Sequence, residues 1–355
     1  MSSLSRLLPA LSAFLLAGCQ SAAYYAQAAQ GQTAMIMKRQ SIPRLLARED
    51  TPADLRGRLE TVQRIREFAI QELDLPAQKQ YATYVELGRD YPVWSVMASP
   101  ELSLAPRTWC YWFVGCLAYR GFFRESMAQY YARELEREGL DVYLSGIPAY
   151  STLGWFHDPV LSSFIKQPEA ELAELIFHEL THQVLFVPGD TTFNESLAVA
   201  VADEGLRRYS LRYPQDLARL QRAKERRDDF VALVLEWRGK LQQLFAQKIS
   251  DAEKRQGKAE VYAGLQAAYA QLKQARWGGY GGYDAWFASL NNAKLNTVNT
   301  YYDLVPALQI LLRQQDNDLP RFFAACRELA RLDKAERHRR LNALQTPTSS
   351  PAPSA

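Results

Sequence analysis

The sequence has little excess charge of either sign, few histidines and only one long apolar run. The net charge is +3, and basic residues are interspersed with acidic ones, so nothing indicates nucleic acid as a partner. The apolar run from Leu7 to Leu16 is too short to span a membrane as a stop-transfer helix. With 48% hydrophobic and 23% charged residues, the chain has ordinary globular values and sufficient length for a sizeable core.

Two of the four histidines stand one helical turn apart in the motif HELTH, which begins at His178. Apolar residues at three- and four-residue spacing predict a helix here, so His178 and His182 project from one face and can bind one zinc ion. Glu179 is turned away from the ligand position and can deprotonate the attacking water as general base. Because histidine is so rare in this chain, chance is a poor explanation for the motif.

A third zinc ligand is expected from a second helix, which restarts after the turn signal at residues 187–190. Glu195 in its first turn can reach back to the metal, as the downstream glutamate does in the thermolysin-like class. A second interpretation stays open, because Thr192 and Glu195 also match a capping box that would close the helix N-terminus. Of the remaining histidines, His157 is a weak candidate for the site, since lone histidines are usually structural.

The N-terminus predicts export and a lipid anchor. Residues 1–18 read as a signal peptide with Arg6 before the apolar run. The sequence Leu-Ala-Gly-Cys that ends at Cys19 resembles the lipobox of bacterial lipoproteins, which implies cleavage before Cys19 and lipidation of its thiol. Gln20 follows, which by the sorting pattern of Gram-negative lipoproteins implies the periplasmic face of the outer membrane. A simple secretory signal or a buried helix is the alternative.

The fold class is predicted to be α+β and mostly helical, with a zincin-like metallopeptidase core and a small mixed sheet. One metallopeptidase domain is expected over residues 19–345. Two long apolar stripes with charged faces predict a helical hairpin inserted at about 214–275. Residues 346–355 are rich in Pro, Ser, Thr and Ala and are predicted to be disordered.

Three further patterns each allow two interpretations. Cys110 and Cys116 could pair in an oxidising compartment, or they could be two buried thiols. Residues 151–154 could be the sheet edge that receives a substrate as an added strand, or an ordinary strand with core contacts. Tyr301 is the candidate donor to the oxyanion of the scissile carbonyl, although one of nineteen tyrosines could equally pack in a helix.

Several blocks together resemble a bacterial zinc aminopeptidase lipoprotein family of the HExxH, gluzincin-like kind. The blocks are residues 112–116, 119–121, 149–156, 177–183, 193–198 and 291–293, together with Tyr301. They span nearly the whole mature chain. The resemblance implies an aminopeptidase with His178, His182 and Glu195 as zinc ligands and Glu179 as base.

The sequence also departs from better-known gluzincins. Only twelve residues separate His182 from Glu195, and Val199 stands where thermolysin-like sequences place an acid that orients a ligand. Asp203 or Glu204 could take that role instead. The motif with which large aminopeptidases grip a free amine is not found, so exo- and endopeptidase action both stay open.

The combined prediction is a zinc-dependent peptidase, an aminopeptidase by resemblance, anchored by lipid at the outer membrane and acting on a peptide substrate. The alternative is a lipid-anchored periplasmic binding or scaffold protein in which zinc only braces two helices. Structural zinc sites usually close with four protein ligands, whereas three ligands leave a position for substrate. A fourth ligand such as His157 would therefore favour the alternative.

Overall fold

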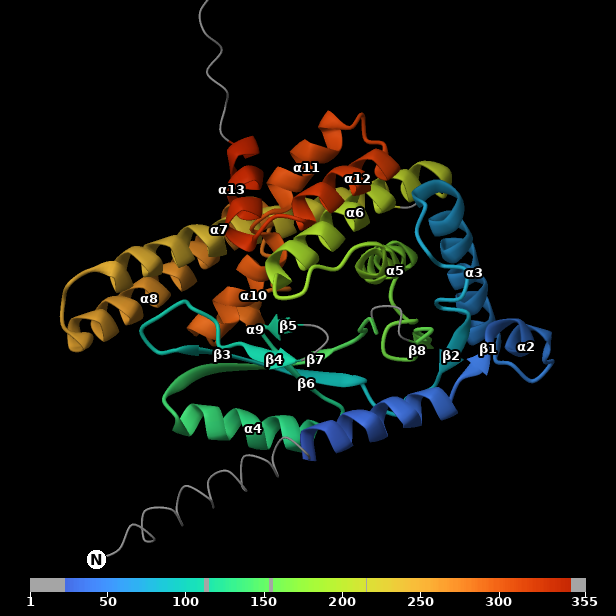
Figure 1. Cartoon of the computed structure of the whole chain (residues 1–355), viewed down its shortest axis with the longest axis horizontal. Helices are drawn as coiled ribbons and strands as arrows, with labels where there is room; N and C mark the ends of the chain where they lie inside the picture. The colour runs from blue at the N-terminus through green and yellow to red at the C-terminus, as the bar shows by residue number, and fades with distance from the viewer. Residues whose placement is uncertain (1–22, 112–114, 153–155, 215, 346–355) are drawn as a thin grey trace, which may run out of the picture.

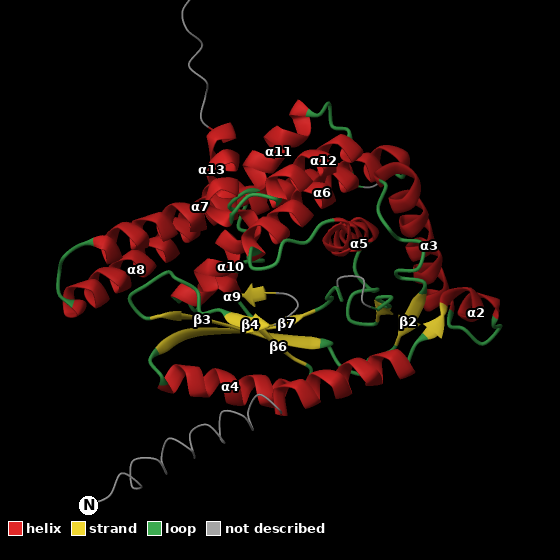
Figure 2. Cartoon of the chain, viewed as in Figure 1, coloured by secondary structure: helices red, strands yellow, loops and turns green. Residues whose placement is uncertain are grey.

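The computed structural model describes residues 23–111, 115–152, 156–214 and 216–345. Over these residues the protein is mostly helical with small sheets, in agreement with the predicted mostly helical α+β class (Figures 1 and 2). The predicted signal peptide, Cys19 and the predicted disordered tail at 346–355 lie outside the described residues. Among the helices that are described, none combines the length and the apolar composition needed to cross a membrane.

The elements alternate between helices and short strands in the first half of the chain and are helical in the second half. A helix over residues 23–37 comes first. The other helices are α2 (Ile42–Ala47), α3 (Ala53–Leu73), α4 (Glu125–Arg137), α5 (Glu169–Val184), α6 (Thr191–Arg212), α7 (Leu217–Ala246), α8 (Asp251–Trp277), α9 (Asp284–Phe287), α10 (Asn292–Tyr302), α11 (Val305–Gln314), α12 (Leu319–Ala330) and α13 (Lys334–Gln345). The strands are β1 (Gln40–Ser41), β2 (Thr83–Val85), β3 (Val93–Pro100), β4 (Trp109–Tyr111), β5 (Gly115–Leu117), β6 (Arg120–Phe122), β7 (Leu140–Ile147) and β8 (Val160–Leu161).

The strands form three small sheets within the described residues, where the sequence predicted one mixed sheet. The mixed sheet has the order β1-β2-β8, with β1 antiparallel and β8 parallel to β2. The largest, β6-β3-β7, is antiparallel, and α4 covers one face while α10 packs against the other (Figure 1). Small residues such as Ala98, Ala128 and Ala132 let α4 approach this sheet closely.

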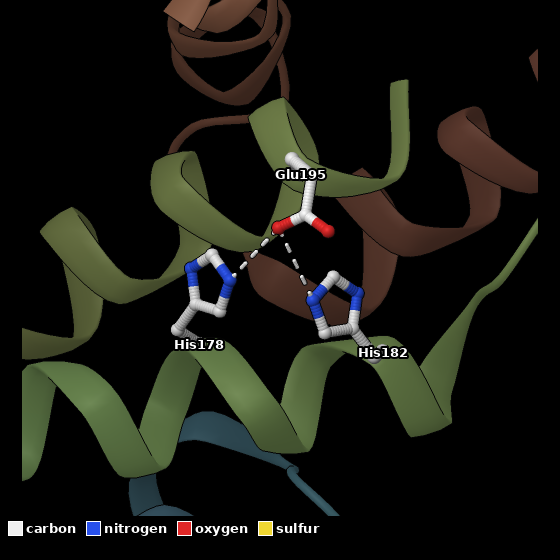
Figure 3. Close-up of side chains that lie close together, drawn as sticks. All are labelled: His178, His182 and Glu195. Carbon is white, nitrogen blue, oxygen red and sulfur yellow. Dashed lines mark hydrogen bonds and ion pairs between the residues drawn. The ribbon is translucent and has the colours of Figure 1, made fainter. Parts of the chain in front are cut away.

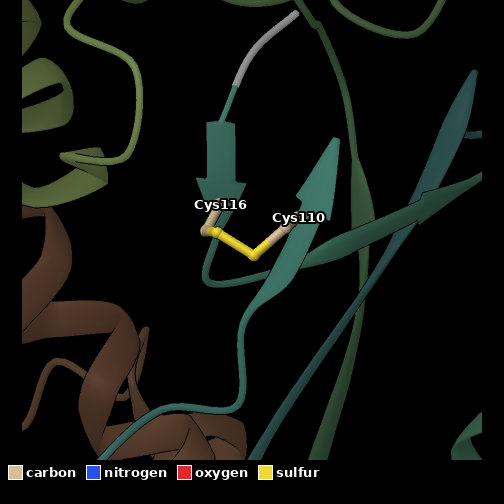
Figure 4. Close-up of a disulfide and its surroundings, with 2 residues drawn as sticks. All are labelled: Cys110 and Cys116. Atoms are coloured by element: carbon tan, nitrogen blue, oxygen red, sulfur yellow. A yellow bond between two sulfur atoms is a disulfide. The ribbon is translucent and has the colours of Figure 1, made fainter. Parts of the chain in front are cut away.

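The third sheet is a disulfide-linked hairpin of β4 and β5. Cys110 and Cys116 lie directly opposite each other across the two strands and form a disulfide bond, which decides between the two interpretations of these residues (Figure 4). At the tip, Gly115 has a φ of +73°, and a Cβ there would lie 2.8 Å from the backbone nitrogen of Gly189. Only glycine fits this contact, so the hairpin is pressed against the connection between α5 and α6.

Helices α5 and α6 pack against each other and occupy the centre of the molecule (Figure 1). The predicted apolar stripe of α5 is buried, and the Phe177 ring lies 5.9 Å from Phe68 on α3 and 6.1 Å from Tyr209 on α6. Helix α6 is buried along most of its length because α5, α10 and α11 all contact it. The long helices α7 and α8 form a hairpin that extends from this core, over the region where the sequence predicted one.

The start of α6 is held by the last helix of the chain. Asp190 caps α6 because its carboxylate accepts a hydrogen bond from the Phe193 N–H. The other partners of this carboxylate come from α13. The Arg337 guanidinium lies 2.9 Å from Asp190 Oδ2, and the His338 imidazole lies 2.9 Å from the same carboxylate. Burial would raise the pKa of Asp190, but His338, Arg337 and Lys334 outweigh it and lower the pKa below its ordinary value.

Replacing Asp190 with alanine is expected to lower the free energy of unfolding by about 3–5 kcal/mol, because Arg337 would be left buried without its counter-ion. Asp190 is only 1% exposed and Arg337 only 3%. Urea denaturation in the presence of a chelator measures the change without any contribution from metal. The exposed pair of Glu328 and Arg331 supplies the control, since Glu328→Ala should change stability by well under about 1 kcal/mol. Equal effects of the two substitutions would show that the buried contacts of Asp190 contribute no more to stability than a surface ion pair does.

Candidate metal centre

His178 and His182 are placed by the packing of α5. Buried Ile176, Phe177 and Leu180 fix which face of this helix meets the core. Because residues four apart share one face, both imidazoles then project toward α6 (Figure 3). His182 is buried and His178 is slightly more exposed.

Glu195 comes from the facing helix α6 and lies between the two imidazoles (Figure 3). Its Oε2 atom is 3.2 Å from His178 Nε2 and 3.6 Å from His182 Nε2. Asp190, and not Thr192, caps α6, so the capping-box interpretation of Glu195 is wrong. The Glu195 side chain is turned inward, where it meets the histidines.

The three side chains form a group that could hold a metal ion. One ligand atom from each of His178, His182 and Glu195 lies within 4.8 Å of the others. In a tetrahedral site with ligand bonds of about 2.0–2.1 Å, neighbouring ligand atoms are about 3.3 Å apart, close to the distances from Glu195 to the imidazoles. Two imidazoles and one carboxylate are also a donor set that zinc accepts. Among the described residues no other such group is found, and His157, exposed in a loop, is not part of this one.

The charges of this group stabilise one another. Burial would raise the pKa of Glu195, but the two imidazoles outweigh it and lower the pKa to about 2. Burial would lower the pKa of His182, but the Glu195 carboxylate outweighs it and raises that pKa. The Glu195 carboxylate therefore favours the protonated form of the His182 imidazole.

Glu179 lies next to this group without being one of its three members. Its carboxyl is largely removed from solvent, and this desolvation raises its pKa above the ordinary value. His178 and His182 oppose the shift, while Glu195 and Asp158 add to it. A carboxylate with a raised pKa beside a metal-binding group is suited to accept a proton from water.

Two tyrosines adjoin the group from other elements. The Tyr301 ring of α10 lies 6.2 Å from the His178 ring and is nearly parallel to it. The negative charge of Glu195, together with burial, raises the pKa of Tyr301 well above its ordinary value, so its hydroxyl stays protonated and able to donate. Tyr119, which follows the disulfide hairpin, lines the same cavity as Tyr301 and Glu195. In the sequence, Tyr119 belongs to one of the blocks that resemble the family, and no pattern there assigns it a role.

The segment predicted as a substrate-receiving edge is a loop where it is described. Ser151 and Thr152 are not in a strand, and residues 153–155 lie outside the described residues. Buried Asp158 organises this loop, because it accepts hydrogen bonds from the Thr152 hydroxyl (2.6 Å) and backbone N–H (3.1 Å). The Gln183 amide also donates to Asp158, at 3.4 Å, which connects the loop to the helix that carries His182.

The acids proposed to orient a ligand have other partners. Asp203 accepts hydrogen bonds from Arg227 and Gln309, and Glu204 accepts from Arg207 and Arg208. None of these partners belongs to the metal-binding group, so the orienting role of Asp203 or Glu204 stays a prediction without a hydrogen bond that supports it in the described residues. The buried Nδ1 of His182 has no hydrogen-bond partner in the described part of the chain.

Comparison with known proteins identifies a family but no individual relative. Residues 23–341 match the family described as "Putative aminopeptidase". Neither the curated proteins nor the solved structures include a match to the chain. The matched residues include the metal-binding group, Glu179, both adjoining tyrosines and the disulfide hairpin. Because the match covers most of the sequence, the chain belongs to the "Putative aminopeptidase" family.

Proposed function

We propose that this protein is a zinc-dependent peptidase, specifically an aminopeptidase, in which His178, His182 and Glu195 hold the metal. The observation that carries the proposal is the convergence of these three side chains, with Glu195 Oε2 at 3.2 and 3.6 Å from the two imidazole nitrogens, close to the spacing of ligands in a tetrahedral site. Membership of an aminopeptidase family supports peptide hydrolysis. The group has three members among the described residues, which is the ligand number of catalytic zinc sites and favours an enzyme over a scaffold braced by zinc.

A zinc ion at this position would polarise the peptide carbonyl and make water easier to deprotonate. Glu179 takes the proton from the attacking water and then passes it to the nitrogen of the leaving amine. Tyr301 donates a hydrogen bond from its hydroxyl group to the oxyanion that develops on the scissile carbonyl. Burial of the group strengthens each of these interactions, because little water is left to screen them.

We also propose that Cys19 carries lipid and that the folded domain lies at the periplasmic face of the outer membrane. The sequence before Cys19 supports this location, as does the disulfide between Cys110 and Cys116, because such bonds persist in oxidising compartments. Labelling with a radioactive fatty acid, in the chain and in a Cys19→Ala variant, tests the anchor directly.

Zinc analysis combined with a peptide library tests the enzymatic proposal. The purified protein is expected to contain one zinc ion per chain and to release N-terminal residues from peptides. A chelator should abolish the release without unfolding the protein, and added zinc should restore it, because catalytic zinc is not needed to hold the core together. If the chelator instead unfolds α5 and α6 and no peptide is ever cleaved, the metal has a structural role and the scaffold alternative is correct. Cleavage within peptides would show an endopeptidase.

A further inference from the structure

A narrow cavity adjoins the metal-binding group between β3 and α10. Glu195 and Tyr301 line it together with Met97, Ala118 and Ala293. Its volume is about 10 Å³, roughly the space that one water molecule requires. The cavity therefore shares two residues with the proposed reaction site and has room for only a small group.

The side chain of Asn296, which lines this cavity, is already engaged. Its amide nitrogen donates to Ser99 Oγ at 2.8 Å and to the Leu104 carbonyl at 3.0 Å. Its oxygen accepts a hydrogen bond from Arg238 Nε at 3.1 Å. Among the described residues that line the cavity, Glu195 is the only charged one, and its charge is paired with the two imidazoles of the metal-binding group. A charged substrate side chain would therefore find no free counter-ion in this lining, which makes its burial unfavourable.

We infer that this cavity receives the side chain of the residue that carries the scissile carbonyl and that it selects the small, uncharged side chains of glycine, alanine and serine. The inference rests on the proposed peptidase function. Glu195 and Tyr301 flank the position of that carbonyl, so the adjacent substrate side chain is the one that reaches the cavity. Alanine at positions 118 and 293 keeps the walls in place, because neither residue has a side chain that can move aside.

Of the described aliphatic residues that line the cavity, Met97 has the longest side chain. It lies in the middle of β3, where it pairs with Tyr143 of β7, and its side chain is half-buried. A methionine fills irregular space with a flexible chain, so its removal should widen the cavity without disturbing the strand. Met97→Ala is expected to raise the ratio of leucine to alanine cleavage by at least about tenfold, the usual effect of methylene-sized changes in an apolar pocket.

The experiment compares the zinc-loaded full chain with Met97→Ala and with Met127→Ala, a control methionine on α4 that packs against the sheet. Peptides that differ only in an alanine, leucine or lysine before the cleaved bond give one readout. The affinity for glycine, alanine and leucine hydroxamates, measured by calorimetry, gives a second readout that needs no turnover. We expect the wild type and Met127→Ala to prefer alanine and to reject lysine, whereas Met97→Ala accepts leucine.

The outcomes separate this inference from the proposed function. Equal cleavage of alanine and leucine peptides by the wild type would overturn the assignment of the cavity while leaving the peptidase intact. If hydroxamates bind but no peptide is cleaved, an alanine preference that Met97→Ala reverses supports the assignment, and equal binding overturns it. Absence of both cleavage and hydroxamate binding would reject the peptidase proposal and this inference with it.

Discussion

Replacing Glu179 with glutamine is expected to slow peptide hydrolysis by about 10²- to 10⁴-fold, the usual contribution of a general base, while the protein keeps its zinc. Glu179 is outside the group of three that can hold the metal, so its loss removes proton transfer and not a ligand. Glutamine has the same size and no charge, and a neutral side chain suits this desolvated position. The turnover number and the zinc content of the purified variant measure the two effects separately.

Glu171 provides the matched control for this substitution. It lies on the same helix but is exposed and pairs with Arg219 at the surface, where an ion pair contributes little. Glu171→Gln should retain both zinc and activity. Full activity of Glu179→Gln would show that another group accepts the proton, and loss of zinc would show that Glu179 is a ligand.

Replacing Glu195 with glutamine is expected to weaken zinc binding by more than about 100-fold, beyond the usual effect of changing a residue that only orients a ligand. The amide keeps the shape of the side chain but removes the negative charge that lies between the two imidazoles. Competition with a chromophoric chelator measures the affinity. Glu204→Gln is the control on the same helix, because Glu204 binds arginines and not the histidines.

The pH dependence of zinc binding should change in the same variant. Glu195 raises the pKa of His182, so the wild-type imidazole holds its proton to higher pH than an ordinary histidine and zinc must displace it. Wild-type affinity should therefore still increase with pH above about 6.5, the ordinary histidine pKa. In Glu195→Gln, the contribution of Glu195 is lost and only Glu179 still opposes burial, which lowers the pKa of His182, so the increase should be complete at lower pH. The same midpoint in both proteins would contradict the assigned cause.

The metal-binding group could be predicted from the sequence because its residues are close along the chain and belong to helices. The spacing of His178 and His182 defines a helical face, and the apolar stripe beside them defines which face is buried. Glu195 follows after one short turn, so few geometries are available to it. The competing capping role of Glu195 could not be rejected from sequence, since the true cap, Asp190, depends on contacts with the distant α13.

The remainder of the site depends on contacts between distant segments. Met97 reaches the cavity from β3 and Tyr119 from the connection between β5 and β6, and the order of the strands follows from pairing that a short sequence pattern does not specify. Strands of two or three residues, such as β2 and β8, are too short to show alternation, which is why three sheets were predicted as one. The role of Asp158 could not be predicted for a similar reason, because its loop partners and Gln183 come together only in the folded chain.

The contact between Asp190 and α13 also makes the start of α6 depend on the last helix of the chain. All three metal-binding residues precede Arg337 and His338, the residues that hold the first turn of α6. A chain shortened before α13 would keep the complete HExxH motif but lose the contacts that hold the start of the helix on which Glu195 lies. Such a shortened chain is expected to bind metal more weakly than the full chain.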